Sequence, residues 1–138
     1  MSTMKISPYL MFNGTAAQAI QLYDRALGAV TATILRHGDV PGMDVPPEKK
    51  GRVMHAELTI GESTVFVSDG EASDSAAGGN VEVCINFDDA ADAAARFEAL
   101  SAGGTVRVPL QDTFWGKFGM LTDVHGVRWM FNVGPEKK

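Results

Sequence analysis

The sequence predicts an α+β fold in which two tandem βαβββ modules form a cupped, mixed β-sheet half-barrel with the helices outside. The order of one strand, one helix and three strands is expected twice along the chain. The two copies also match in sequence about 75 residues apart, with Phe12 opposite Phe87 and Gly28 opposite Gly103. A polar, Gly/Ser-rich segment, "DGEASDSAAGGN", separates them. An internal repeat of this length indicates a duplicated structural unit, so it decides the predicted architecture.

The first module is predicted from hydrophobic spacing and turn residues. The aromatic stretch "ISPYLMFNG" (6–14) is typical of a strand that ends in an Asn-Gly turn. The segment 15–29 has apolar residues at helical spacing, and Thr15 with Gln18 three residues later forms a capping-box pattern. Three strands are expected after this helix, at 30–37 and, on both sides of a turn at Gly61, within 52–70.

The second module repeats this order. The stretch "NVEVCINF" (80–87) is expected to form its first strand, and Asp88 or Asp89 to cap the helix over 90–104. The remaining strands are predicted at 105–111, 118–123 and 127–133, the last two as a hairpin. We therefore expect a single domain over 1–138, made of a first module at 1–68, a linker at 69–79 and a second module at 80–138.

Alternating polarity in the strands predicts which side chains face the helices. Side chains of a strand point alternately to its two faces, so His55 and Glu57 share the face opposite to that of Ala56 and Leu58. The helix-facing set is expected to be Met54, Ala56, Leu58, Ile60, Val83, Ile85, Val127, Trp129 and Phe131. The other face is expected to carry His55, Glu57, Thr59, Glu82, Cys84, Asn86, Arg128, Met130 and Asn132. This pattern fits either a polar cavity or a water-facing sheet, and periodicity does not separate the two.

Composition narrows the classes of function. Of the 138 residues, 45% are hydrophobic and 21% are charged, which is typical of a globular protein. The formal net charge of -5, without a basic stripe interleaved with aromatic residues, argues against a nucleic-acid partner. No apolar run approaches the roughly 20 residues that span a bilayer, and the N-terminus lacks the features of a secretion signal. With Cys84 as the single cysteine, no internal disulfide can form. We expect a cytoplasmic protein with no membrane partner.

Three stretches resemble a known family. "SPYLMFNGTAAQAIQLYDRALG", "HAELTIG" and "PLQDTFWGKFGMLTDVHGVRWMFN" are similar to the PhnB-like group of the vicinal oxygen chelate superfamily. That superfamily includes glyoxalase I, the bleomycin and fosfomycin resistance proteins, and the extradiol dioxygenases. The resemblance implies a glyoxalase-like fold and a homodimer. The group has often carried the label 3-demethylubiquinone 3-methyltransferase, although the sequence shows no Gly-rich nucleotide-binding turn between a strand and a helix of a long βαβ unit.

The resemblance also implies where metal ligands would lie, namely at Pro8, Glu57, Glu82 and Met130. Pro8 has no side-chain ligand, and Met130 stands where glyoxalases typically have a glutamate. A thioether is a poor ligand for hard divalent ions, so we expect no metal cofactor held by the full ligand set. As an alternative, a divalent ion could be bound by Glu57, Glu82 and His55.

A metal-free cup that binds a small, partly apolar molecule is the favoured function. Because an imidazole changes charge near neutral pH, His55 is the candidate catalytic base, with Glu57 as its orienting partner. The expected ligand contacts are His55, Glu57, Glu82, Cys84, Trp115 and Arg128. The alternatives are a metal-dependent lyase, isomerase or dioxygenase using Glu57, Glu82 and His55, and a cup without chemistry that serves regulation or interaction. A purely structural role also stays open for His55 and for Trp115.

Overall fold

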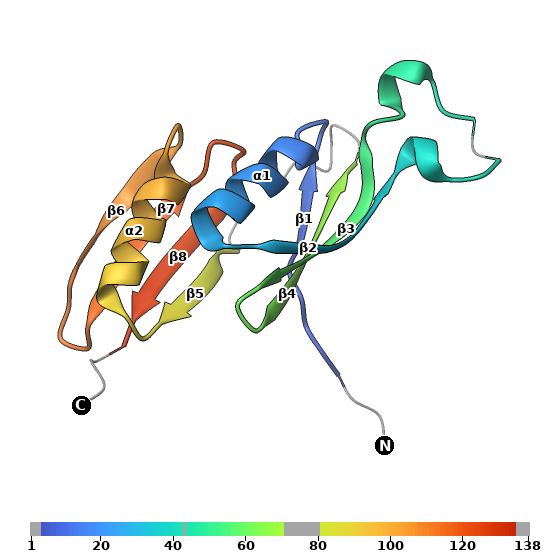
Figure 1. The fold of residues 1–138 in the computed structure, drawn as a ribbon. Coiled ribbons are helices and arrows are strands. Elements are labelled where there is room, and N and C mark those ends of the chain that lie inside the picture. Colours follow the sequence, from blue (N-terminus) through green and yellow to red (C-terminus); the bar gives the residue numbers. More distant parts are fainter. Residues whose placement is uncertain (1–3, 43, 71–80, 135–138) are drawn as a thin grey trace. The chain divides into compact units, whose positions relative to one another are not determined.

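The structure, a computed structural model, describes residues 4–42, 44–70 and 81–134. The chain divides into two compact units, Met1–Ser75 and Ala76–Lys138, which we call unit 1 and unit 2 (Figure 1). Each unit carries one strand, one helix and three further strands in that order, which confirms the α+β class and the repeated βαβββ arrangement. The predicted linker, 69–79, lies outside the described residues from residue 71 onward. The joint half-barrel stays a prediction, because each unit is described by itself.

Unit 1 is a four-stranded sheet with a helix against one face. Its elements are β1 (Tyr9–Phe12), α1 (Ala16–Leu27), β2 (Val30–Arg36), β3 (Val53–Ile60) and β4 (Ser63–Asp69), with the short 3-10 helices η1 (His37–Asp39) and η2 (Pro47–Lys49) between β2 and β3. The strand order is β1-β4-β3-β2. Strand β1 runs parallel to β4, and the other neighbours are antiparallel. The first and last strands of the unit therefore lie side by side, and β1 and β2 form the edges.

Unit 2 repeats this topology. Its elements are β5 (Val83–Phe87), α2 (Ala90–Ser101), β6 (Thr105–Asp112), β7 (Lys117–Thr122) and β8 (Arg128–Val133). The strand order is β5-β8-β7-β6, with β5 parallel to β8. The pairing of β6 with β7 shifts twice, around Arg107 and around Pro109. Since proline cannot donate to a strand ladder, an irregular edge strand is where Pro109 is tolerated.

Each helix buries an apolar stripe against the apolar face of its own sheet. In unit 1, Ala56 and Leu58 of β3 are fully buried. In unit 2, Phe97 of α2 meets Phe131 of β8 edge to face, with ring centroids 5.1 Å apart. Trp129 is also buried there. Burial of each large apolar side chain contributes about 1.5–3 kcal/mol. The predicted helix-facing positions are thus confirmed at Ala56, Leu58, Val127, Trp129 and Phe131, which are all buried.

The predicted alternation of β3 breaks at its first residues. Leu35 of β2 pairs with His55, whereas the next residue, Arg36, pairs with Val53, so the register shifts by one residue. Val53 is fully buried, while Met54, which the alternation places on the helix-facing side, is only half-buried. A β-bulge accounts for this, because one extra residue in a strand reverses the alternation beyond it.

The start of α1 corrects a prediction. Thr15 occupies the N-cap position but makes no side-chain cap hydrogen bond. The carboxylate of Asp69, at the end of β4, instead accepts hydrogen bonds from the backbone N–H groups of Gly14 (2.8 Å) and Ala16 (3.0 Å). The predicted capping box of Thr15 and Gln18 is therefore wrong. A buried carboxylate brought in by tertiary structure satisfies these amides more strongly than a local hydroxyl would.

The helix of unit 2 begins where the sequence predicts. Oδ1 of Asp89 accepts hydrogen bonds from the N–H groups of Ala91 (2.9 Å) and Asp92 (3.1 Å), which confirms Asp89 as the cap. Helices α1 and α2 have 12 residues each. In the part of the chain that the structure describes, no helix is long and apolar enough to cross a membrane.

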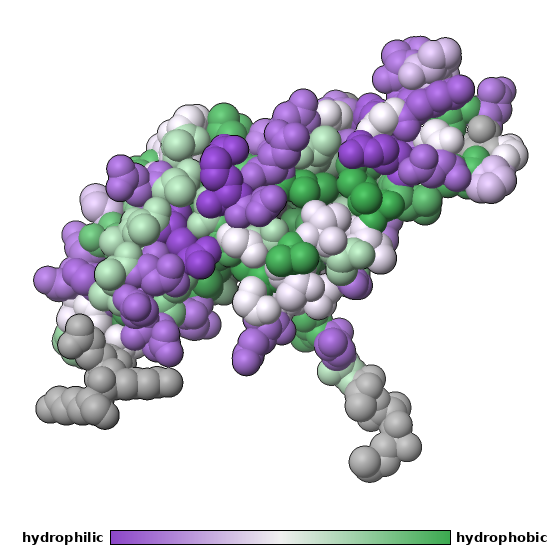
Figure 2. Space-filling view, viewed as in Figure 1, coloured by the Kyte–Doolittle hydropathy of each residue, from purple (hydrophilic) through white to green (hydrophobic). Residues whose placement is uncertain are grey.

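Strand β2 is an edge strand with apolar side chains at the surface. Val30, Ile34 and Leu35 are all exposed in unit 1. Figure 2 shows hydrophobic residues on the surface over this part of the unit. An edge strand with an exposed apolar surface is able to pair with another strand.

Candidate functional site

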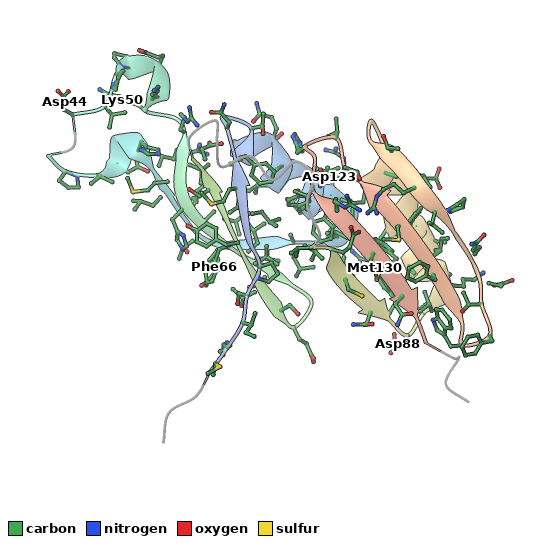
Figure 3. The ribbon with its side chains drawn as sticks, turned by 180° about the vertical axis from the view of Figure 1, so that it is seen from behind. Asp44, Lys50, Phe66, Asp88, Asp123 and Met130 are labelled. Carbon is green, nitrogen blue, oxygen red and sulfur yellow. The ribbon has the colours of Figure 1, made fainter. Side chains whose placement is uncertain are left out.

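The face of the unit 1 sheet that points away from α1 carries polar and aromatic side chains. Tyr9 on β1 is the register partner of Phe66 on β4, and Phe66 is the partner of Glu57 on β3. These three residues therefore form one row across the sheet, because register partners point to the same face. His55 lies two residues from Glu57 on the same face, as the alternation predicts. Figure 3 marks Phe66 within this row.

Three rings gather on this face. The ring centroids of Tyr9 and Phe66 are 5.6 Å apart, those of His55 and Phe66 are 5.2 Å apart, and those of Tyr9 and His55 are 5.7 Å apart. The hydroxyl of Tyr9 lies 2.8 Å from Nδ1 of His55, and the imidazole tautomer decides which of the two groups donates. The structure thus pairs His55 with Tyr9, a residue that the analysis of the sequence missed. The sequence did contain a signal for Tyr9, because the alternation of side chains in "PYLMF" assigns it to one face of the strand.

Glu57 lies in the same row, without a hydrogen-bond or ion-pair partner among the described residues. The residue is half-buried, and its carboxylate makes no hydrogen bond or ion pair with any residue that the structure describes. The predicted role of Glu57 as the orienting partner of His55 is therefore not seen, because Tyr9 holds Nδ1. His55 and Glu57 share a face, but they are not bonded to each other.

In unit 2, Glu82 is held between two arginines. Its Oε1 lies 2.6 Å from Nη2 of Arg107, and its Oε2 lies 2.5 Å from Nε of Arg128. Arg107 is fixed in turn, since it also donates to Oγ1 of Thr122 (3.0 Å) and to the carbonyl of Leu121 (2.9 Å). The side chain of Glu82 is only 16% exposed. Both carboxylate oxygens are therefore already occupied by strong charge-assisted hydrogen bonds.

The arginines also set the charge state of Glu82. Burial alone would raise the pKa of this carboxyl, but the hydrogen bonds and charges of Arg107 and Arg128 outweigh it and hold the pKa below its usual value. Glu82 is therefore ionised at neutral pH, and the cluster of one carboxylate and two guanidinium groups carries a net positive charge. The sequence did not predict the role of Arg107, because its partners Glu82, Leu121 and Thr122 are distant from it in the sequence.

Cys84 and Met130 lie in the next row of the same face. Cys84 of β5 is the register partner of Met130 of β8, which is labelled in Figure 3, and Met130 is in turn the partner of Met120 of β7. Cys84 is exposed as a residue, yet partial burial raises the pKa of its thiol above the usual value. A raised pKa keeps the thiol protonated at neutral pH and hence a weak nucleophile. A role of Cys84 in lining the face is consistent with this.

Trp115 lies at the far end of the unit 2 sheet, in the turn before β7. Its Nε1–H donates to Oδ1 of Asn132 (2.8 Å), and Asn132 donates to Oδ1 of Asn86 (3.1 Å). Trp115 is 37% exposed, and the adjoining Phe114, which packs edge to face against it, is 97% exposed. The hydrogen bond fixes one edge of the indole, and the ring stays accessible for stacking.

The backbone of this turn depends on Gly116. Its φ is +153°, and a Cβ at this position would lie 2.0 Å from the carbonyl oxygen of Val133. No side chain fits there without moving β8. The position of Trp115 is therefore fixed both by its own hydrogen bond and by the close approach of the next residue to the sheet.

Three of the four positions at which the sequence resemblance implies metal ligands carry no free donor for a hard divalent ion, and Glu57 is the exception. Pro8 has no side-chain donor, and its carbonyl accepts a hydrogen bond from the N–H of Phe66 (2.9 Å). Met130 offers a thioether, and Glu82 has both oxygens in ion pairs. Within the described residues of either unit, no group of three or more His, Cys, Asp or Glu side chains could hold a metal ion.

Comparison with known proteins places these features in a family. A family model described as 3-demethylubiquinone-9 3-methyltransferase matches residues 4–131. Protein YjdN of Escherichia coli is 32% identical over 143 residues, which cover 94% of this chain and 95% of YjdN. The crystal structure of PA1353 from Pseudomonas aeruginosa shares 36% identity and a TM-score of 0.83, over 96% of this chain and 98% of that one. The PhnB protein from Bacillus cereus shares 25% identity and a TM-score of 0.73, over 95% and 100% of the two chains.

A more distant structure shares the fold alone. It is a glyoxylase/bleomycin resistance protein/dioxygenase domain from a Frankia species, with 13% identity and a TM-score of 0.69 over 97% of this chain and 100% of that one. The similarity places the repeated βαβββ arrangement in the glyoxalase-like fold, and one fold supports many different activities.

Proposed function

The chain belongs to the PhnB-like family described as 3-demethylubiquinone-9 3-methyltransferase, and we propose that it binds a small, partly apolar molecule on the non-helix faces of its sheets. The observation that carries this proposal is the row on unit 1, where two aromatic rings and a half-buried carboxylate share a face with His55. Small-molecule sites typically combine aromatic walls with a few fixed polar groups.

Unit 2 supports the same proposal with a different set of groups. The positive cluster of Glu82, Arg107 and Arg128 is fixed by ion pairs, and Trp115 presents an accessible ring that Asn132 holds in place. Groups that are already oriented lose little conformational freedom when a ligand binds, so they suit recognition. His55, Glu57, Cys84, Trp115 and Arg128 remain the ligand contacts we propose, with Glu82 acting through the two arginines.

We propose binding without the full metal-ligand set. A divalent ion that used Glu82 would have to displace Arg107 and Arg128 from its two carboxylate oxygens. Titration of the purified protein with zinc, nickel, manganese and iron(II), followed by calorimetry, tests this point. We expect no stoichiometric binding in the micromolar range. Tight stoichiometric binding of any of these ions, lost in Glu57→Gln, would favour the metal-dependent lyase, isomerase or dioxygenase instead.

The methyl transfer named in the family description is not part of the proposal. Cofactors with anionic groups commonly use free N–H groups at a helix N-terminus. In this chain, Asp69 accepts the N–H groups at the start of α1, and Asp89 accepts those at the start of α2. At or next to the start of each helix, two N–H donors are therefore already engaged by the chain's own carboxylates.

Ligand affinity in two variants tests the proposed site. A library of small aromatic and amphipathic molecules is screened by thermal shift, and the hits are titrated against His55→Ala, Glu57→Gln and the wild type. We expect each variant to weaken binding of the hits at least about tenfold, which corresponds to about 1.4 kcal/mol. Glu62→Gln, in the turn between β3 and β4, is the matched control and should bind like the wild type. Unchanged affinity for every hit in both site variants would overturn the proposal.

A further inference from the structure

We propose that the non-helix face of unit 1 binds the cationic nitrogen of an organic ligand, such as an amine or a quaternary ammonium group. Glu57 would supply the opposite charge, and the rings of Tyr9 and Phe66 would supply the aromatic walls. This inference rests on the proposed function and names the chemical class of ligand that the same site takes.

The first argument is the state of Glu57. It is half-buried, and its carboxylate has no hydrogen-bond or ion-pair partner among the described residues. Its register neighbours are Phe66 on β4 and Thr33 on β2, neither of which carries a charge. A partly buried carboxylate is stabilised when a cation binds it, because burial has already removed part of its hydration.

The second argument is that the chain's own cations on this sheet are engaged elsewhere. Arg36, at the end of β2, donates through Nη1 to the carbonyl of Gly51 (2.8 Å). Arg52, just before β3, donates through Nη2 to Oδ1 of Asn13 (3.1 Å) and to the carbonyl of Gly70 (2.7 Å). His55, the ionisable neighbour on the same face, is bonded to Tyr9. Among the described residues of unit 1, therefore, no cation forms an ion pair with Glu57, which leaves its negative charge available to a ligand.

Glu82 provides a contrast within the same molecule. Both residues lie at positions where the sequence resemblance places ligands, and both are only partly exposed. Glu82 is neutralised by Arg107 and Arg128, whereas Glu57 has no such partner in the described residues. Because the chain satisfies one carboxylate internally and leaves the other open, Glu57 is the one available to a ligand.

The third argument is the aromatic surroundings. The face of an aromatic ring attracts a cation within about 6 Å of its centroid, and the attraction strengthens when the cation is partly desolvated. The ring centroids of Tyr9 and Phe66 lie 5.6 Å apart, and Glu57 is the direct cross-strand neighbour of Phe66. Tyr9 is 47% exposed, so its ring is accessible. Aromatic rings recognise quaternary ammonium groups, and the neighbouring carboxylate adds the opposite charge.

A pair of probes that differ only in charge tests this inference. Choline and its neutral carbon isostere, 3,3-dimethyl-1-butanol, have nearly the same shape, and the second has a carbon where the first has the cationic nitrogen. Each is titrated into ¹⁵N- and ¹³C-labelled full-length protein while the resonances of Tyr9, His55 and Phe66 are followed. We expect choline to shift these resonances and to bind at least tenfold more tightly than the neutral probe.

Variants then separate charge from shape. Glu57→Gln keeps the size of the side chain and should weaken choline binding at least tenfold while leaving the neutral probe unchanged. Glu62→Gln removes the same charge from an exposed turn and should leave both probes unchanged, and the amide spectrum of each variant reports whether it is folded. Equal affinity for the two probes, no effect of Glu57→Gln on choline, or no response of the three residues to choline would each overturn the inference. The proposed function fails by a different result, namely library hits that bind with full affinity to both His55→Ala and Glu57→Gln.

Discussion

The hydroxyl of Tyr9 lies 2.8 Å from Nδ1 of His55, although 46 residues separate the two in the sequence. The strand order explains the contact, because β4 lies between β1 and β3 and carries Phe66 in the same row as Tyr9. The tyrosine on the edge strand therefore reaches over Phe66 to the histidine on β3. This hydrogen bond orients the imidazole and leaves its Nε2 as the nitrogen available to a ligand.

Substituting Tyr9→Phe should release the imidazole without disturbing the ring cluster. The variant keeps the aromatic ring and loses only the hydroxyl, so we expect the free energy of unfolding to fall by less than about 1 kcal/mol. The ¹⁵N resonance of His55 Nδ1 should move, since its hydrogen-bond partner is gone. An Nδ1 resonance that is the same in Tyr9→Phe and wild type would contradict the contact.

Asp69 should contribute far more to stability than Thr15, which is the local cap candidate. In Asp69→Asn, one oxygen becomes an NH₂ donor. The N–H of Val53, or those of Gly14 and Ala16, then lose their acceptor in a buried site. We expect a loss of at least about 2 kcal/mol in the free energy of unfolding, measured by urea denaturation. Thr15→Ala should cost less than about 0.5 kcal/mol, because Thr15 makes no cap hydrogen bond. Equal costs for the two variants would show that the local cap dominates.

The sequence could predict the elements of the fold, although it could not predict the tertiary contact that Asp69 makes. The strands and helices follow from periodicity, because burial of one face imposes a period of two on strands and of 3.6 on helices. The assignment of Ala56, Leu58, Trp129 and Phe131 to the buried faces follows from the same rule. The internal repeat also predicted that both modules have the same topology, since two similar segments adopt similar structures.

The contacts of the candidate site were not predictable in this way. Alternation tells which face a side chain is on, but not which strand lies beside it or in what register. The bond between Tyr9 and His55 depends on β4 lying between their strands, and Arg107, which pairs with Glu82, lies at a register shift in β6. Contacts between residues distant in the sequence could therefore be identified only from the structure, whereas the sheet face of each side chain could be predicted from the sequence.

Homodimerisation remains a prediction from the family resemblance, and strand β2 gives it a structural basis. This edge strand exposes Ile34 and Leu35. We expect light scattering at micromolar concentration to give the mass of a dimer, and Ile34→Lys to raise the dissociation constant at least tenfold, since it places a charge on the edge. Gln21→Lys, on the exposed side of α1, is the control and should leave the dimer intact. A monomeric mass for the wild type would refute the prediction.

Glu82 should make stability depend on pH in a defined direction. The pKa of Glu82 is held below its usual value in the folded chain, so its ionised form stabilises the fold above the unfolded pKa, near 4.5. That contribution is lost as the pH falls through the lower folded pKa. Glu82→Gln removes the negative charge that both Arg107 and Arg128 contact. We therefore expect it to lower the free energy of unfolding by about 1–3 kcal/mol at pH 7.

The difference between Glu82→Gln and wild type should shrink steadily below about pH 4.5, because protonated glutamic acid no longer pairs with either arginine. Urea denaturation at several pH values between 7 and 3 measures this difference. Glu62→Gln, in the exposed turn between β3 and β4, controls for the general effect of removing one acidic charge and should cost less than about 0.5 kcal/mol throughout. A cost of Glu82→Gln that is the same at pH 7 and at pH 3 would mean that the two ion pairs do not stabilise the fold. The arginines would then hold Glu82 in position for recognition alone.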